Sequence, residues 1–227
     1  MSNNSNNLPV EMDKNKTTIK ANEKAEIDDL FVLANNYFEE GDFEKAKLYY
    51  EKAIELGANF PEVFGNLAST LLELNEYARA IPLFEKCLDL EPSEKAKYII
   101  NYAIALFRNG EKEKAINILQ TILGKTKNEH LEALAHYHMG LFILEQNPKK
   151  ALKHFKTSLK FEALAETYYE ASCAFARLSK KGEAAKMLKK AVKLDSSFKQ
   201  IALNDPDLKE IIAMPSIKQF FKKIPVK

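Results

Sequence analysis

The sequence predicts an all-α fold, an α-solenoid built from stacked antiparallel helix pairs. Apolar residues recur at helical spacing, and between residues 61 and 94 two such runs are separated by the polar corner Asn75-Glu76. A small residue returns in the second run of each unit, at spacings of 34, 35, 36 and 33 residues. The 227 residues include no Trp and only seven Gly, whereas a sandwich or barrel would need many more turns. One helix pair cannot bury its apolar faces alone, so the pairs are expected to stack.

Five repeats fit this pattern, at about residues 27–60, 61–95, 96–132, 133–164 and 165–196. The small residues of the first helices are Ala34, Ala68, Ala103, Gly140 and Ser172, and those of the second helices are Ala46, Ala80, Ala115, Ala151 and Ala184. A large residue follows four places after each second-helix alanine, namely Tyr50, Phe84, Leu119, Phe155 and Leu188. Small and large side chains are thereby expected to alternate in one core.

Short polar corners separate the two helices of each repeat. Residues that enter the left-handed backbone conformation easily are expected to end the first helices, namely Gly41, Asn75, Gly110 and Asn147. The fourth repeat has the shortest corner and a longer preceding link, from Gly124 to His130, so its tilt is expected to differ.

The repeat from Pro61 to Glu94 resembles a tetratricopeptide repeat. That family has a 34-residue period, a small residue midway along each helix, an aromatic residue late in the second helix and a proline at the end, here Pro92. The resemblance implies a right-handed superhelix over residues 23–195 and a role in holding other proteins.

The two ends of the chain differ from the repeats. Residues 1–22 carry few apolar groups, which predicts a disordered N-terminal tail. Residues 197–227 are expected to form capping helices and a basic tail. There, Asp205 precedes a proline at a helix start and apolar residues follow on one face, as in the closing segment of many bacterial repeat proteins, which this segment resembles.

Composition limits the partner and the compartment. Lys and Arg number 34 against 32 Asp and Glu, so the net charge of +2 argues against a nucleic-acid partner, and the lysine pairs are interpreted as solvated helix edges. Two cysteines cannot form a disulfide framework, and no apolar stretch approaches the length of a membrane span or a signal sequence. We therefore expect a cytoplasmic protein without membrane insertion.

The binding surface is expected on the concave face, which the first helices should line. The candidate groove residues are Phe31, Asn35, Asn66, Ser69, Lys97, Ile100, Asn101, Ile104, Arg108, Tyr137, His138, Leu141 and Tyr169. Six of these thirteen are apolar or aromatic, which predicts apolar anchors for a ligand. The amides Asn35, Asn66 and Asn101 could hold the backbone of an extended peptide, because each can donate and accept a hydrogen bond. Alternatively, they bond a neighbouring repeat.

A variant of the family clamps the C-terminal carboxylate of heat-shock chaperones, and the resemblance allows a comparison with that pattern. Asn35, Asn66 and Lys97 match its positions, whereas Phe31 replaces a lysine and Asn101 replaces an arginine. Two of the cationic groups that would bind a carboxylate are therefore missing.

The sequence favours a non-catalytic adaptor, a monomer or weak homodimer, that binds a partner peptide or helix in its groove. The alternative is a self-assembling structural component or a chaperone-like protein, whose groove is filled by another copy or by its own tail. No catalytic, cofactor or metal residue is predicted. His136, His138, His154 and Cys173 lack metal-site spacing, and no phosphate loop or nucleophile elbow is present.

Overall fold

The computed structural model describes residues 14–90 and 96–224. Within those ranges the chain forms α-helices and one 3-10 turn, and no strand. The elements are α1 (Lys14–Glu39), α2 (Phe43–Glu55), α3 (Pro61–Glu73), α4 (Tyr77–Leu90), α5 (Ala96–Arg108), α6 (Lys112–Gln120), α7 (Glu129–Ile143), α8 (Pro148–Phe161), α9 (Ala165–Arg177), α10 (Lys181–Leu194), α11 (Phe198–Asn204), η1 (Pro206–Leu208), α12 (Lys209–Ile212) and α13 (Pro215–Lys222).

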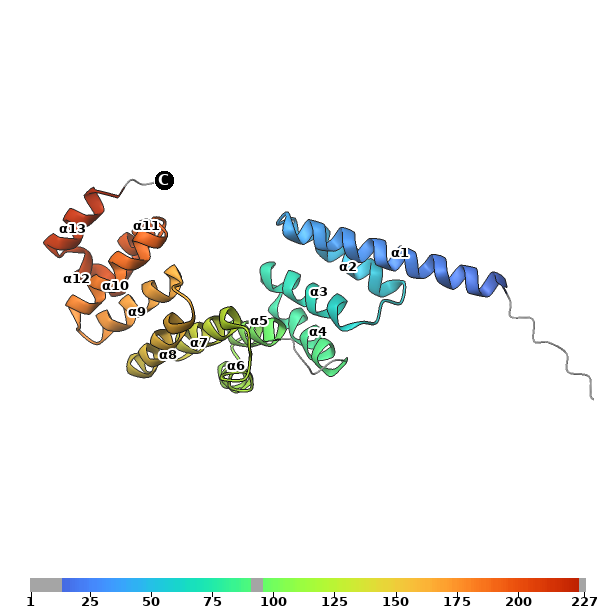
Figure 1. Cartoon of the computed structure of the whole chain (residues 1–227), viewed down its shortest axis with the longest axis horizontal. Helices are drawn as coiled ribbons and strands as arrows, with labels where there is room; N and C mark the ends of the chain where they lie inside the picture. Colours follow the sequence, from blue (N-terminus) through green and yellow to red (C-terminus); the bar gives the residue numbers. More distant parts are fainter. Residues whose placement is uncertain (1–13, 91–95, 225–227) are drawn as a thin grey trace, which may run out of the picture.

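Helices α1 to α10 pack as five successive pairs, and the pairs follow one another along a curved path (Figure 1). Each second helix also packs against the first helix of the next pair, as α8 does against α9. Helices α3, α5, α7 and α9 lie toward the hollow of the curve, while α4, α6 and α8 lie on its outer side. The all-α solenoid predicted from the sequence is confirmed.

The positions that define the repeat form the core. The small residues of both helices are buried in all five pairs, and so are the large residues that follow in the second helices, from Tyr50 at 1% exposure to Leu188 at 0%. In the last pair the two small positions touch, because the Ser172 hydroxyl donates to the carbonyl of Ala184 at 2.9 Å. The predicted register is therefore confirmed.

Four of the corners within the pairs contain a residue in the left-handed conformation, and one of these residues was not predicted. Gly41, Asn75 and Gly110 have positive φ angles as predicted, of 79°, 61° and 91°. Asn147 does not: its φ is −149°, and its side chain instead accepts from the Lys150 amide as the N-cap of α8. Ser179 takes the left-handed position in the last pair, at φ 57°.

The predicted boundaries change at both ends of the repeat domain. Helix α1 begins at Lys14, so residues 14–22 are helical rather than part of a disordered tail. Residues 1–13 and Pro92, the expected repeat-closing proline, lie outside the described residues. Helix α7 begins at Glu129, four residues before the expected start of the fourth repeat, because Asn128 caps it by accepting from the Leu131 amide.

The segment after α10 covers the open end of the stack. Asp205 accepts from the Asp207 amide at 2.8 Å and starts the turn at Pro206, as the sequence indicates. Leu208, Ile211, Ile217 and Phe221 are all buried and join the core cluster of α9 and α10. This segment removes from water an apolar face that the last repeat would otherwise expose.

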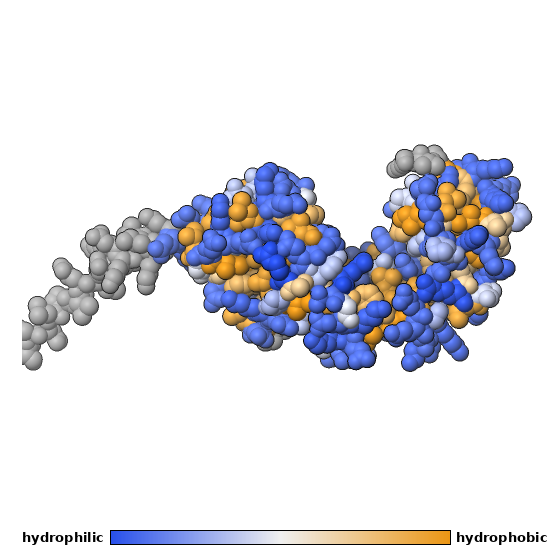
Figure 2. Space-filling model, turned by 180° about the vertical axis from the view of Figure 1, so that it is seen from behind, coloured by the Kyte–Doolittle hydropathy of each residue, from blue (hydrophilic) through white to orange (hydrophobic). Residues whose placement is uncertain are grey.

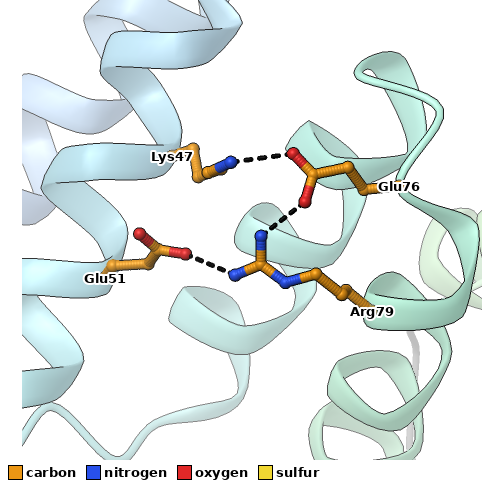
Figure 3. A network of polar contacts seen from close by, with 4 residues as sticks. All are labelled: Lys47, Glu51, Glu76 and Arg79. Carbon is orange, nitrogen blue, oxygen red and sulfur yellow. Dashed lines mark hydrogen bonds and ion pairs between the residues drawn. The ribbon is translucent and has the colours of Figure 1, made fainter.

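A charged network fixes the angle between the first two pairs. Lys47 of α2 donates to Glu76 in the next pair's corner at 2.7 Å, and Arg79 of α4 contacts both Glu76 and, at 2.8 Å, Glu51 of α2 (Figure 3). Hydrogen bonding from Lys47 lowers the pKa of Glu76. Because Arg79 is exposed and the other three groups are only partly buried, each ion pair contributes modestly, about 0.2–1 kcal/mol.

The close approach of α7 and α8 can be tested at Gly140. A Cβ there would overlap the ring of Phe155, so Gly140→Ala is expected to lower the free energy of unfolding by about 1–3 kcal/mol. Gly182→Ala in α10 is the matched control, because nothing lies within 4 Å of its added methyl group. That control should stabilise slightly through helix propensity. Equal melting temperatures for the two variants would contradict the placement of Gly140.

Candidate functional site

The inner helices α1, α3 and α5 line an open cavity of about 410 Å³ on the concave side. The space-filling view shows the molecule hollowed between its N-terminal and C-terminal parts (Figure 2). The lining residues are Asn35, Phe38, Glu39, Tyr50, Asn66, Ser69, Lys97, Tyr98 and Asn101. Five of these are among the residues predicted from the sequence, and we call the whole set the amide pocket.

A row of hydrogen bonds crosses the amide pocket from one repeat to the next. Asn35 Oδ1 accepts from the Tyr50 hydroxyl at 2.5 Å and from Asn66 Nδ2 at 2.9 Å. Asn66 Oδ1 in turn accepts from the Tyr98 hydroxyl at 2.7 Å. Asn66 is thus held on both sides, which makes it a structural link between repeats in addition to a wall of the pocket.

Asn101 continues the row with fewer internal partners. Its Nδ2 donates to Ser69 Oγ at 3.1 Å, and Ser69 donates to the carbonyl of Gly65 at 2.8 Å. Within the described residues, the Asn35 Nδ2 and Asn101 Oδ1 atoms have no protein partner. One donor and one acceptor therefore face the cavity, the pair of functions that a peptide bond requires.

The hydroxyls of two tyrosines hold this row of amides in place from the core side. Burial raises the pKa of Tyr50 to about 12 and also raises the pKa of Tyr98, so both hydroxyls stay protonated and act as donors. The other repeats have Phe or Leu where Tyr50 stands. A hydroxyl at a core position needs a hydrogen-bond acceptor. The tyrosine at position 50, where the other repeats have Phe or Leu, is therefore the feature of the sequence that could have predicted a contact between Tyr50 and the amides.

Several predicted groove residues belong to the core instead. Ile100 is 3% exposed and Tyr169 is 5% exposed. Phe31 packs edge-on against the Phe60 ring at 5.0 Å, and Ile104 and Leu141 are half-buried against the same core. Ile100 and Tyr169 are therefore buried rather than exposed to a groove, whereas Phe31, Ile104 and Leu141 are only half-buried and their groove role stays a prediction.

The remaining predicted residues lie further along the concave side. Arg108 is exposed at the end of α5, whereas Tyr137 and His138 are half-buried on α7, with their rings 4.9 Å apart. Burial and the nearby Arg108 charge lower the pKa of His138 to about 4, so its imidazole is neutral near pH 7. None of these three residues lines the amide pocket.

The cap covers the concave side of the fifth pair. The Tyr169 hydroxyl donates to Asp205 at 2.5 Å, Cys173 Sγ donates to the same carboxylate at 3.5 Å, and Arg177 donates to Asp207 at 2.6 Å. The open part of the concave face is therefore restricted to the earlier pairs. This explains why Tyr169 is buried.

Two clusters were considered as metal sites. Cys173, Asp205 and Asp207 place one ligand atom each within 4.8 Å of one another, but Tyr169 and Arg177 already bind the two carboxylates. Burial also raises the pKa of the Cys173 thiol, which keeps it protonated, whereas a metal ligand is a thiolate.

The second cluster consists of two histidines whose spacing in the sequence did not predict a contact between them. His136 of α7 and His154 of α8 bring their Nδ1 atoms to 3.0 Å. Burial lowers the pKa of each ring, so they form a neutral hydrogen-bonded pair. The hydrogen bond between the two neutral rings therefore accounts for this pair as a packing contact between α7 and α8.

The fold and its concave face define a helical repeat protein of the kind that binds other polypeptides. Models of the tetratricopeptide repeat match residues 27–60, 71–136 and 165–198, together more than half of the chain. The chain belongs to the tetratricopeptide repeat family. Members of this family generally bind protein or peptide partners and are generally non-catalytic. Among the residues that the structure describes, no helix combines the length and the apolar character needed to cross a membrane.

Similar proteins extend this assignment. The chain is 25% identical over 187 residues to the human protein O-mannosyl-transferase TMTC3, a match that covers 80% of this chain but only 17% of the relative. The solved structure of PilW, a type IV pilus biogenesis factor, has a TM-score of 0.69 at 18% identity and covers 87% of this chain and 90% of that one. YrrB, described as a TPR protein with an unusual peptide-binding site, has a TM-score of 0.55 at 21% identity, covering 74% and 85%. At these identities the solved structures show the fold alone.

The buried edge of the cap predicts a pH effect at Glu170. Burial, and then the charge of Asp205, raise the pKa of Glu170 from 4.5 to about 7. Since the folded state binds this proton more tightly than the unfolded state, the carboxylate destabilises the fold above pH 7, and the penalty disappears as the pH falls toward 4.5. Glu170→Gln should therefore raise the free energy of unfolding at pH 8 by about 1–3 kcal/mol and change it little at pH 4.5. Thermal melts at the two pH values measure this, and an equal shift at both would contradict the assignment.

Proposed function

We propose that this protein is a non-catalytic adaptor whose amide pocket binds an extended segment of a partner protein. The observation that carries the proposal is the open cavity lined by Asn35, Ser69, Lys97 and Asn101. Its walls combine three amides with aromatic rings and two exposed groups of opposite charge, Glu39 and Lys97, a surface suited to main-chain groups.

The spacing of the amides supports an extended ligand. Asn35, Asn66 and Asn101 stand on three successive inner helices, so the row runs across the repeats. The unpaired amide functions at its two ends, Asn35 Nδ2 and Asn101 Oδ1, can meet a carbonyl and an amide of the same strand. Contacts of this kind tolerate different ligand side chains, because they are made to the backbone.

The floor of the amide pocket is held in place before any ligand arrives. Tyr50 and Tyr98 fix Asn35 and Asn66 from the core side, so neither amide must lose rotamer freedom on binding. Preorganisation of this kind lowers the entropic cost of association. Lys97 is exposed at the rim and adds a positive charge that favours an acidic or carboxylate group nearby.

Substitutions in the amide pocket separate binding from folding. Lys97→Ala and Asn101→Ala should each weaken partner affinity about five- to tenfold, the value of one hydrogen bond, and leave the melting temperature unchanged. Asn66→Ala should instead lower the free energy of unfolding by about 1–3 kcal/mol, because the hydrogen bonds of Asn66 with the Tyr98 hydroxyl and with Asn35 are lost.

The measurement has two stages. The full chain and the Lys97→Ala/Asn101→Ala variant capture proteins from the source cell, and the segment retained only by the unmodified chain is then synthesised and titrated by fluorescence anisotropy. Lys112→Ala, outside the amide pocket, is the matched control. If the double variant retains the same proteins with the same affinity, the amide pocket is not the binding site. A second copy of the chain as the retained protein would support self-assembly instead.

We also propose that the protein works as a monomer or weak dimer in the cytoplasm. Cys87 and Cys173 are both buried, lie in different repeats and form no disulfide with each other, which suits a reducing compartment. Sedimentation over a range of concentrations tests the oligomeric state.

A further inference from the structure

The net charge of +2 conceals two halves of opposite sign. Residues 1–144 contain 16 Lys and Arg against 23 Asp and Glu, whereas residues 145–227 contain 18 against 9. The C-terminal half therefore has a positive field that the net charge of the whole chain does not reveal.

Eight of these lysines lie on the second helices of the last two pairs, α8 and α10. Lys149, Lys153, Lys156 and Lys160 recur along α8 at offsets of four, seven and eleven residues, which places them on one side of that helix. Lys186, Lys189, Lys190 and Lys193 do the same on α10. All eight are exposed except Lys189, which is half-buried. We call these eight residues the lysine face.

The two rows meet across α9. The Lys156 ammonium lies 5.8 Å from the centre of the Phe175 ring, and the Lys190 ammonium lies 4.8 Å from that of Tyr168. Tyr168 and Phe175 are seven residues apart on α9, two turns along the same side of that helix. Lysines from both neighbours of α9 thus cover one surface, and the outer margin of this part of the molecule is largely hydrophilic (Figure 2).

The lysine face lacks the counter-charges found elsewhere. In the N-terminal half, Lys45, Lys47 and Arg79 all pair with carboxylates. Within the part of the chain that the structure describes, none of the eight lysines forms an ion pair. The four lysines of α10 instead surround a shallow hollow of about 450 Å³ with Met214 and Ala185. A surface of this kind attracts a polyanion.

We propose that the lysine face adsorbs to the anionic headgroups of a lipid bilayer. Two observations favour lipid over nucleic acid. The face carries lysine and no arginine, and its aromatic rings lie beneath the lysines, whereas nucleic-acid grooves use exposed aromatic rings and arginine for stacking. Phe161 and Leu194, which end α8 and α10 directly after Lys160 and Lys193, are 40% and 55% exposed and can enter the headgroup layer.

This orientation keeps the amide pocket accessible. The lysine face lies on α8 and α10 of the last two pairs, while the amide pocket lies on α1 to α5 of the first three pairs. The protein could therefore present a bound polypeptide at a membrane surface. Adsorption does not depend on the proposed peptide binding, so the two can be tested separately.

Vesicle flotation of the full chain tests the proposal. One set of vesicles is phosphatidylcholine alone, and the other contains about one third phosphatidylglycerol, an anionic fraction that gives a strong surface potential. The full chain should float with the anionic vesicles and not with the neutral ones, and the bound fraction should fall as salt is raised.

Matched variants assign the binding to the lysine face. Lys186→Gln, Lys189→Gln, Lys190→Gln and Lys193→Gln together should reduce partitioning at least about tenfold. The control removes the same charge from the third repeat and its following link, through Lys112→Gln, Lys114→Gln, Lys125→Gln and Lys127→Gln, and should bind nearly as the unmodified chain. Circular dichroism melts confirm that both variants fold. Equal binding by the two variants, absence from anionic vesicles, or tighter binding to single-stranded RNA than to vesicles would each overturn the proposal.

Discussion

The closest approach of the two helices within each pair is the constraint on which this structure depends. Only a small side chain fits at that point, and the large residue one turn later then fills the space around it. At Gly140 even a methyl group would overlap the ring of Phe155 on the paired helix α8. A similar limit acts between neighbouring pairs, because a methyl group at Gly65 of α3 would meet the Tyr98 ring of α5 at 2.6 Å. These contacts set the distance between backbones, and the same distance repeated along the chain generates the curve seen in Figure 1.

The amide pocket follows from this packing. Gly65 allows Tyr98 to cross from α5 onto α3, where its hydroxyl is buried and must find an acceptor. Asn66 supplies that acceptor and also donates to Asn35. The buried tyrosine hydroxyl thus requires an amide beside it, and this requirement places a row of amides along the inner surface. The side chains that suit a ligand's backbone are therefore also the ones that join the first three repeats.

The C-terminal end of the solenoid determines where a ligand can reach the concave side. At the C-terminal end, Asp205 and Asp207 bind Tyr169 and Arg177 and close the concave side of the last pair. Ligand access is thereby moved toward the N-terminal repeats. Helices α8 and α10 at the same end carry the lysine face, so the fold separates the amide pocket from a strongly basic surface.

The sequence by itself determined the helix pairs, their register and most of the corners, because period, small residues and turn formers act locally. Asn35, Asn66, Ser69, Lys97 and Asn101 could also be assigned to the inner side by helical arithmetic alone. Exposure, by contrast, depends on the packing of the whole chain: Ile100 and Tyr169 share that inner side but are covered by neighbouring helices and the cap. Helical periodicity gives the direction of a side chain from its own axis, whereas its burial depends on the angle and distance of elements far away in the sequence, as with Tyr169 and Asp205.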